Sequence, residues 1–208
     1  MLKICAMEED HVDCIVEMHM KCFPGFFLTS LGKGFLKQYY KSLLQSERSV
    51  ALIITDDAEE PRGFVTGVIN PSGFYMELLR THWYRFFVLS LLEALKRPKI
   101  VPRLLRALAK PKLSISNENV AELTSICVDP EYENIGYGKA LVQAFSNEVR
   151  KKECKEIVLY TDADKNERVN SFYKDLGFIV ARSFTTPEGR NMHEYRRYIS
   201  RHNERAFS

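Results

Sequence analysis

Residues 120–151 read VAELTSICV-DPEYENIGYG-KALVQAFSNEVRK, and this stretch decides the fold. Its first nine residues alternate in polarity and are rich in strand-favouring side chains, which predicts a β-strand. Asp129-Pro130 ends that strand, because proline cannot extend a central ladder. From Lys139 onward apolar residues recur at helical spacing, which predicts an amphipathic helix.

The loop between this strand and this helix, Pro130–Gly138, is suited to holding a pyrophosphate. Gly136 and Gly138 can take positive φ and leave room for a ligand to approach the backbone. The free N–H groups in the first turn of the helix would face that ligand, and the helix dipole favours its negative charge. A short Gly-x-Gly stretch is also common in ordinary helix-entry turns, so its surroundings must decide between the two interpretations.

The surroundings continue with a short buried strand, Ile157–Tyr160, then Asn166, Tyr173 and the triplet Leu176-Gly177-Phe178. Together with the loop, these residues resemble the GNAT superfamily of N-acetyltransferases, which transfer acetyl from acetyl-CoA to an amine. In that family the loop usually has Arg or Gln, two residues, Gly, one residue, and Gly or Ala. The glycines match here, whereas Glu133 stands at the first of these positions.

The resemblance implies that the chain binds acetyl-CoA as co-substrate, without a metal. The strand Val120–Val128 should splay from its neighbour and offer its backbone to the pantetheine, and the loop should hold the pyrophosphate. The asparagine should reach the cofactor arm, with a helix N-cap as its alternative role. The expected cofactor-binding residues are Ile126, Cys127, Val128, Glu133, Asn134, Ile135, Gly136, Tyr137, Gly138, Lys139 and Asn166.

Acetyl transfer also needs an acid for the leaving thiolate and a base for the amine. Tyr173 occupies the position that carries the acid in the family that the chain resembles; its alternative role is a core aromatic. Glu122 begins the predicted strand where similar enzymes carry a glutamate that works through water, and its alternative is an exposed strand end. Asp162 and His193 are lesser candidates for the base. Cys127 is expected to pack rather than to act as a nucleophile.

Length and composition indicate one globular domain that spans residues 1–208. The chain is 45% hydrophobic and 27% charged, with a net charge of +3 that is too mild to indicate nucleic-acid binding. Its five cysteines are odd in number and lack C-x-x-C spacing, which predicts reduced thiols rather than a disulfide framework or a zinc site. Acidic residues near the start argue against a signal peptide, so we expect a cytoplasmic protein.

The remaining patterns predict an α/β fold with a mixed, twisted sheet of about seven strands and helices on both faces. The expected strands are Leu2–Ala6, Ser49–Asp56, Gly63–Asn70, Val120–Val128, Ile157–Tyr160, Phe178–Thr185 and Met192–Ile199. The expected helices are Asp10–Cys22, Gly34–Gln45, the one that follows the glycine loop, and Asn166–Leu176, with residues 23–32 as a loop.

A basic helical insertion is predicted at residues 74–112, between the third and fourth strands. Residues 76–112 hold nine Lys and Arg side chains against two Glu, with aromatic residues interspersed. Three interpretations stay open: a solvated helical pair at the rim of the site, an acceptor site for an anionic substrate, and a membrane-surface element. The oligomeric state is also open.

The function predicted from the resemblance is acetyl transfer from acetyl-CoA to an amine acceptor, such as an anionic amino sugar nucleotide. One alternative is acetylation of a protein N-terminus or lysine. A second alternative, from a different class, is a non-catalytic module that binds acetyl-CoA or associates with a membrane. Tyr173 together with an intact glycine loop favours the enzyme, and Glu133 favours the module.

Overall fold

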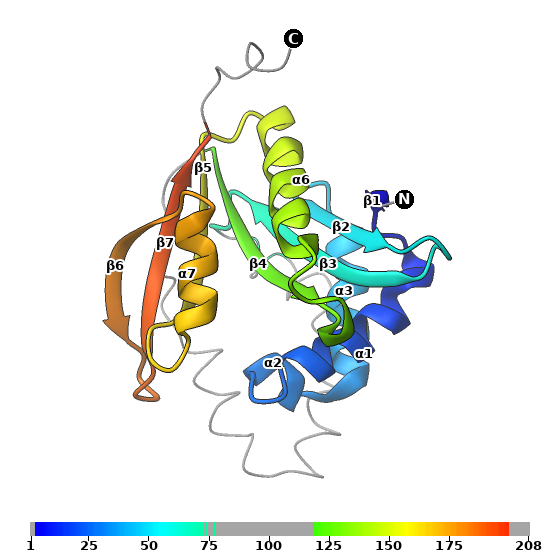
Figure 1. Cartoon of the computed structure of the whole chain (residues 1–208), viewed down its shortest axis with the longest axis horizontal. Coiled ribbons are helices and arrows are strands. Elements are labelled where there is room, and N and C mark those ends of the chain that lie inside the picture. Colours follow the sequence, from blue (N-terminus) through cyan, green and yellow to red (C-terminus); the bar gives the residue numbers. More distant parts are fainter. Residues whose placement is uncertain (1–2, 73, 75–76, 78–118, 200–208) are drawn as a thin grey trace.

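The computed structural model describes residues 3–72, 74, 77 and 119–199 (Figure 1). These residues form a seven-stranded sheet in the order β1-β2-β3-β4-β5-β7-β6. Strands β4 and β5 are parallel, and the other neighbouring strands are antiparallel. The strands are β1 (Lys3–Ala6), β2 (Ser49–Thr55), β3 (Pro61–Ile69), β4 (Val120–Val128), β5 (Glu156–Asp162), β6 (Ile179–Thr185) and β7 (Asn191–Tyr198).

Helices cover both faces of the sheet (Figure 1). One face packs against α1 (Val12–Cys22) and α3 (Gly32–Leu44), which are joined through the short helix α2 (Phe27–Ser30). The other face packs against α6 (Tyr137–Lys151) and α7 (Glu167–Asp175). Each face therefore has its own hydrophobic core, as expected when amphipathic helices bury their apolar sides against a sheet.

Alternation along β4 divides its side chains between these two cores. Ala121 and Leu123 belong to the core beneath α6, so Glu122 between them points toward the α3 face. A β-bulge interrupts the pairing with β3 between Thr66 and Gly67, where Thr124 has no opposite residue. A bulge adds one residue and changes the alternation that follows it.

Strands β4 and β5 separate shortly after they meet. Their pairing consists of Val120 with Glu156, Ala121 with Ile157, and Glu122 with Val158. The two strands are described in full, and their register contains no pair beyond Glu122. The later backbone groups of β4 on this side are therefore left for a partner other than β5.

The structure confirms the predicted fold class, a mixed seven-stranded sheet with helices on both faces. The 23–32 segment was predicted as a loop, but residues 27–30 form α2. The basic insertion at 74–112 lies largely outside the described residues. No helix in the described part of the chain is long and apolar enough to span a bilayer.

The prediction of five reduced thiols differs from the structure at one pair. Cys22, at the end of α1, and Cys127, on β4, form a disulfide. Helix α1 packs against β4 and places the two side chains together. No local sequence pattern indicates this pair, because the two residues are 105 positions apart.

Candidate active site

The glycine loop leads directly into α6, as predicted. Gly136 is the N-cap of the helix and has φ +93°, a left-handed conformation that favours glycine. A Cβ at this position would meet no atom within 4 Å, so the loop surface beside it is open. The first backbone bond of the helix runs from Ala140 N to Gly136 O, at 3.0 Å. The amides ahead of Ala140 therefore precede the hydrogen-bonded ladder of the helix and can meet a ligand.

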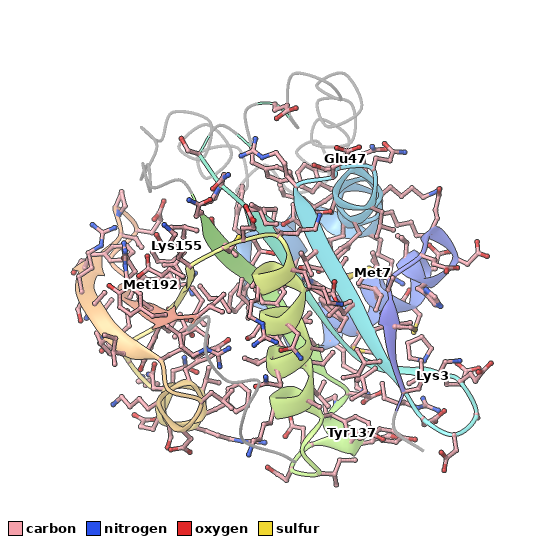
Figure 2. The ribbon with its side chains drawn as sticks, turned by 90° about the horizontal axis from the view of Figure 1, so that it is seen from above. Lys3, Met7, Glu47, Tyr137, Lys155 and Met192 are labelled. Atoms are coloured by element: carbon pink, nitrogen blue, oxygen red, sulfur yellow. A yellow bond between two sulfur atoms is a disulfide. The ribbon has the colours of Figure 1, made fainter. Side chains whose placement is uncertain are left out.

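Gly138 has a different role from the one predicted. It is not among the described glycines with positive φ, and it lies within the first turn of α6. A Cβ there would lie 3.3 Å from Cζ of Phe172, on α7. The absence of a side chain at Gly138 thus lets α7 pack closely against the start of α6. Figure 2 shows Tyr137 at the start of α6, at the end of the helix away from Lys155, which lies just ahead of β5.

Glu133, which departs from the family pattern, is paired in the structure. Nη2 of Arg168, on α7, donates to Glu133 Oε2 at 2.8 Å and to Asn134 Oδ1 at 3.1 Å. Sequence reasoning noted the carboxylate and did not anticipate its partner. The two residues are 35 positions apart, and only the packing of α7 on α6 brings them together.

The open part of β4 contains Ile126, Cys127 and Val128. Ile126 and Val128 contact the core beneath α6, whereas Cys127 is buried toward α1. The Cys127 sulfur is bonded to that of Cys22, so it is not a free nucleophile, and the side chain packs toward α1. The opening supplies the splayed strand expected of this segment, while the binding of acetyl-CoA by these three residues stays a prediction.

Glu122 lies at the point where β4 and β5 separate. It is the last residue of β4 that pairs with β5, and it also pairs with Val68 on β3. Burial raises the pKa of Glu122 to about 7. An exposed strand-end glutamate would keep an ordinary pKa, so the structure favours the buried base over that alternative. A carboxyl group with a pKa near neutrality can accept a proton at physiological pH.

Two tyrosines approach Glu122, and sequence reasoning missed both. Burial, with a smaller effect of the Glu122 charge, raises the pKa of Tyr39 on α3. Burial, followed by the charges of Glu194 and Glu122, raises the pKa of Tyr160 on β5 to about 12. The Tyr160 hydroxyl is buried and makes no hydrogen bond of good geometry among the described residues, although the Arg182 guanidinium lies close enough to oppose the rise of its pKa.

Tyr160 lies on the same side of the sheet as Glu122, so the Tyr160 hydroxyl is a candidate for contact with the acceptor. It packs with Val120 and Val158, on the paired part of β4 and β5, two residues before the end of its own strand. A buried hydroxyl without a partner is unusual in a folded protein. The short apolar run Ile157–Tyr160 was the only sequence signal for Tyr160, and it did not distinguish this side chain from a core aromatic.

Tyr173 lies on α7 and packs into the core beneath α6. Its ring contacts Phe178 and Tyr195, with ring centroids 5.6 and 5.8 Å away. Burial raises its pKa well above the ordinary tyrosine range, so the hydroxyl keeps its proton at neutral pH. The structure thus shows a core aromatic that is also a protonated donor, and its catalytic role stays a prediction.

Comparison with known proteins decides the family. The sequence model of the acetyltransferase (GNAT) family matches residues 12–178, which is most of the chain. The chain belongs to the GNAT family. It is therefore an acetyltransferase, which uses acetyl-CoA as co-substrate and an amine as acceptor.

One curated GNAT relative is glucosamine 6-phosphate N-acetyltransferase from Trypanosoma brucei brucei. It is 33% identical to this chain over 69 residues, which cover 33% of this chain and 44% of the relative. The match thus spans less than half of the relative's length.

Solved structures share the fold over nearly the whole chain. The ribosomal-protein-S18-alanine N-acetyltransferase from Escherichia coli has a TM-score of 0.59 at 17% identity and covers 100% of both chains. Ard1 from Thermoplasma volcanium has a TM-score of 0.62 at 13% identity, covering 96% of this chain and 98% of that one. An N-acetyltransferase from Staphylococcus aureus Mu50 has a TM-score of 0.63 at 12% identity, covering 95% and 98%. At these identities the likeness shows the GNAT fold alone.

The other predicted residues of this GNAT protein have mixed outcomes. Asn166 stands at the N-cap of α7 but makes no side-chain cap; its Nδ2 instead donates to Thr161 Oγ1 at 2.8 Å and to Asp162 O at 3.0 Å. Asp162 is held by Arg190 in a bidentate ion pair, with nitrogen–oxygen distances of 3.0 and 2.7 Å. The Asp162 carboxylate oxygens are therefore already occupied by Arg190.

His193 is also engaged, because its Nδ1 lies 2.7 Å from Ser183 Oγ. The structure thus favours Glu122 as the base over both lesser candidates.

Proposed function

We propose that this protein transfers acetyl from acetyl-CoA to the primary amine of an amino sugar phosphate, with Glu122 as base and Tyr173 as acid. The observation that carries the mechanism is the place of Glu122. A half-buried carboxyl group with a pKa raised to about 7 stands where β4 and β5 begin to separate. No described cation pairs with it, and a pKa perturbed by burial in this way supports a catalytic role over a purely binding one.

In this proposal the cofactor binds at the opening between β4 and β5. The pyrophosphate binds the backbone amides of Ile135–Lys139, and the pantetheine lies along Ile126–Val128 in place of the missing β5 pairs. Support comes from the open surface at Gly136 and from the register that ends at Glu122. The thioester then lies near Glu122, with Tyr173 approaching from the α6 side of the sheet.

The two residues divide the proton transfers. Glu122 accepts a proton from the acceptor's ammonium group, directly or through a water molecule. The neutral amine attacks the thioester carbonyl, and the carbon–sulfur bond breaks. Tyr173 donates its proton to the leaving sulfur, and the second amine proton replaces the one that Tyr173 lost. The products are the acetamide, CoA as a free thiol, and one proton, which Glu122 carries away.

Two observations support a polar, anionic acceptor. The partial relative acts on glucosamine 6-phosphate by its name, and that likeness supports this substrate class. Arg190 lies on the turn between β6 and β7, and its guanidinium stacks over Phe26, just ahead of α2, at 5.4 Å. This contact joins the turn to the α1 side of the molecule. Arg190 is thus a cation suited to a sugar phosphate, although Asp162 already holds part of its charge.

A direct experiment is to measure thiol release from acetyl-CoA with three acceptors: glucosamine 6-phosphate, glucosamine, and a peptide with an N-terminal alanine. We expect the phosphorylated sugar to give the highest kcat/KM. Acetylation of the peptide alone would replace the acceptor and leave the mechanism standing. If acetyl-CoA binds and none of a broad set of amines is acetylated, the proposed function is wrong.

A further inference from the structure

Arg168 has an unusual position for a surface arginine. It belongs to α7, yet its guanidinium lies at the glycine loop ahead of α6, where Nη2 bonds both Glu133 and Asn134. The Arg168 side chain is 68% exposed and that of Glu133 is 38% exposed. The loop residues from Glu133 to Gly136 are exposed as well. The guanidinium therefore faces solvent at the mouth of the proposed cofactor site.

The negative charge of Glu133 would repel a phosphate at this loop, and Arg168 offsets that charge. A phosphate ligand would meet the carboxylate of Glu133, where the family usually has Arg or Gln. The first turn of α6 contains no acidic residue, so Glu133 is the last carboxylate in the chain before the helix begins. An ion pair with Arg168 offsets this negative charge, and it also fixes the guanidinium beside the loop.

We propose that Arg168 binds a phosphate group of CoA and takes the place of the basic residue that the loop lacks. Arginine has five N–H donors, and the two bonds to the loop use only those of Nη2. Among the described contacts the donors on Nε and Nη1 remain, and each can form a charge-assisted bond to a phosphate oxygen on its own side of the guanidinium. Glu133 and Asn134 are positioning residues, because they act through the guanidinium.

The fold makes this relocation possible. Phe172, one turn beyond Arg168, packs against Gly138 in the first turn of α6. Residues four apart lie on the same face of a helix, so this packing also directs Arg168 toward the loop. The cation is thus supplied from a second helix rather than from the loop itself.

The test is calorimetric titration of CoA into four variants at low and moderate salt. They are Arg168→Ala, Glu133→Gln, the double variant, and Lys174→Ala as a control. Lys174 is an exposed cation near the other end of α7. We expect Arg168→Ala to weaken CoA binding about ten-fold or more, and more strongly at low salt, because a charge-assisted contact is lost. We expect Lys174→Ala to leave the affinity unchanged.

The double variant separates contact from simple neutralisation. If Arg168 touches phosphate, its removal still weakens CoA binding when Glu133 is already Gln. If Arg168 only offsets the Glu133 charge, its removal has no effect in that background, and the proposal is overturned. Repeating the titrations with dephospho-CoA identifies the phosphate: a loss retained there assigns the pyrophosphate, and a loss that disappears assigns the 3′-phosphate.

This inference rests on the proposed cofactor site, and the two can fail separately. Wild-type protein that does not bind CoA would contradict the proposed function. Wild-type protein that binds CoA, loses affinity in Gly136→Val and keeps it in Arg168→Ala would contradict only the role of Arg168.

Discussion

Strands β4 and β5 behave differently in their first and last parts. The first part, Val120–Glu122 with Glu156–Val158, is paired in a regular parallel ladder. The last part, Leu123–Val128 with Leu159–Asp162, has no such pairs. The paired part satisfies its own backbone groups, whereas the open part leaves donors and acceptors that need another partner. The paired part therefore holds the sheet together, and the open part is where the proposed function places the ligand.

Two glutamates make the same contrast with side chains. Glu156, in the paired part, is buried and bound by Arg196 Nη1 at 3.1 Å. Glu122, at the opening, is half-buried; the burial of its carboxyl group raises its pKa, and no described cation offsets the effect. Buried charges in proteins are usually paired, so the unpaired one is the candidate for chemistry.

The largest effect is expected from Glu122→Gln, which tests the contrast between the paired and open parts of the strands. Removal of the base should lower kcat by about 10²–10⁴-fold while the affinity for CoA stays unchanged. The active form is the carboxylate, so wild-type activity should also fall as the pH drops below about 7. Steady-state kinetics with glucosamine 6-phosphate, or with whichever acceptor is found, measures both effects.

The matched control for that prediction is Glu156→Gln. It should lower the melting temperature, because it weakens the pair with Arg196, and leave kcat close to wild type. Equal losses of kcat in the two variants would remove the distinction between the paired and open parts.

A loss of about a hundred-fold in kcat is expected from Tyr173→Phe, near the lower end of the range for a lost general acid. The hydroxyl is needed only as the thiolate leaves, so CoA affinity should not change. Tyr195→Phe is the control, since Tyr195 is equally buried but its hydroxyl bonds Asn170 Oδ1 at 3.1 Å. Wild-type turnover in Tyr173→Phe would leave only its core role.

The role of the glycine loop before α6 is tested by Gly136→Val. A β-branched residue at φ +93° is strained and would also crowd the ligand, so we expect CoA affinity to fall by about ten-fold. Gly189→Val is the control, because Gly189 has a similar φ of +81° in the turn between β6 and β7. Calorimetry should show normal CoA affinity for Gly189→Val. Equal affinities in both folded variants would contradict the assignment of the loop.

The smallest effect is expected from Tyr160→Phe. If the unpaired hydroxyl contacts the acceptor, its loss should raise the KM for the acceptor by about five- to ten-fold, the value of one hydrogen bond. Tyr198→Phe serves as the control, because Tyr198 is 72% exposed at the end of β7. An unchanged acceptor KM in Tyr160→Phe would remove Tyr160 from the acceptor site.

The sequence predicted the fold and the entry into α6 more completely than the surroundings of Glu122. Strand β4 and the start of α6 follow from local patterns, and the bounds Val120–Val128 agree with the structure. Gly136 was correctly expected to take positive φ, because a tight helix entry requires it. Gly138 was not, since its role depends on Phe172 of another helix.

The features that were missed depend on contacts between distant segments. Arg168 meets Glu133 only after α7 docks on α6, and Cys22 meets Cys127 only after α1 docks on β4. Tyr160 is distinguished by an unsatisfied hydroxyl, which no sequence pattern reports. Local periodicity therefore specified the elements, while tertiary packing specified most of the chemistry.

The most direct test of the account is the pKa of Glu122 itself. Carbon-13 NMR of protein labelled at the glutamate side-chain carboxyl follows each group with pH, and Glu122→Gln identifies the Glu122 signal by its loss. We expect a midpoint near pH 7, because burial without a described cation nearby disfavours the charged form. A midpoint near the ordinary value of about 4.3 would contradict it, since Glu122 would then be a solvated strand-end carboxylate.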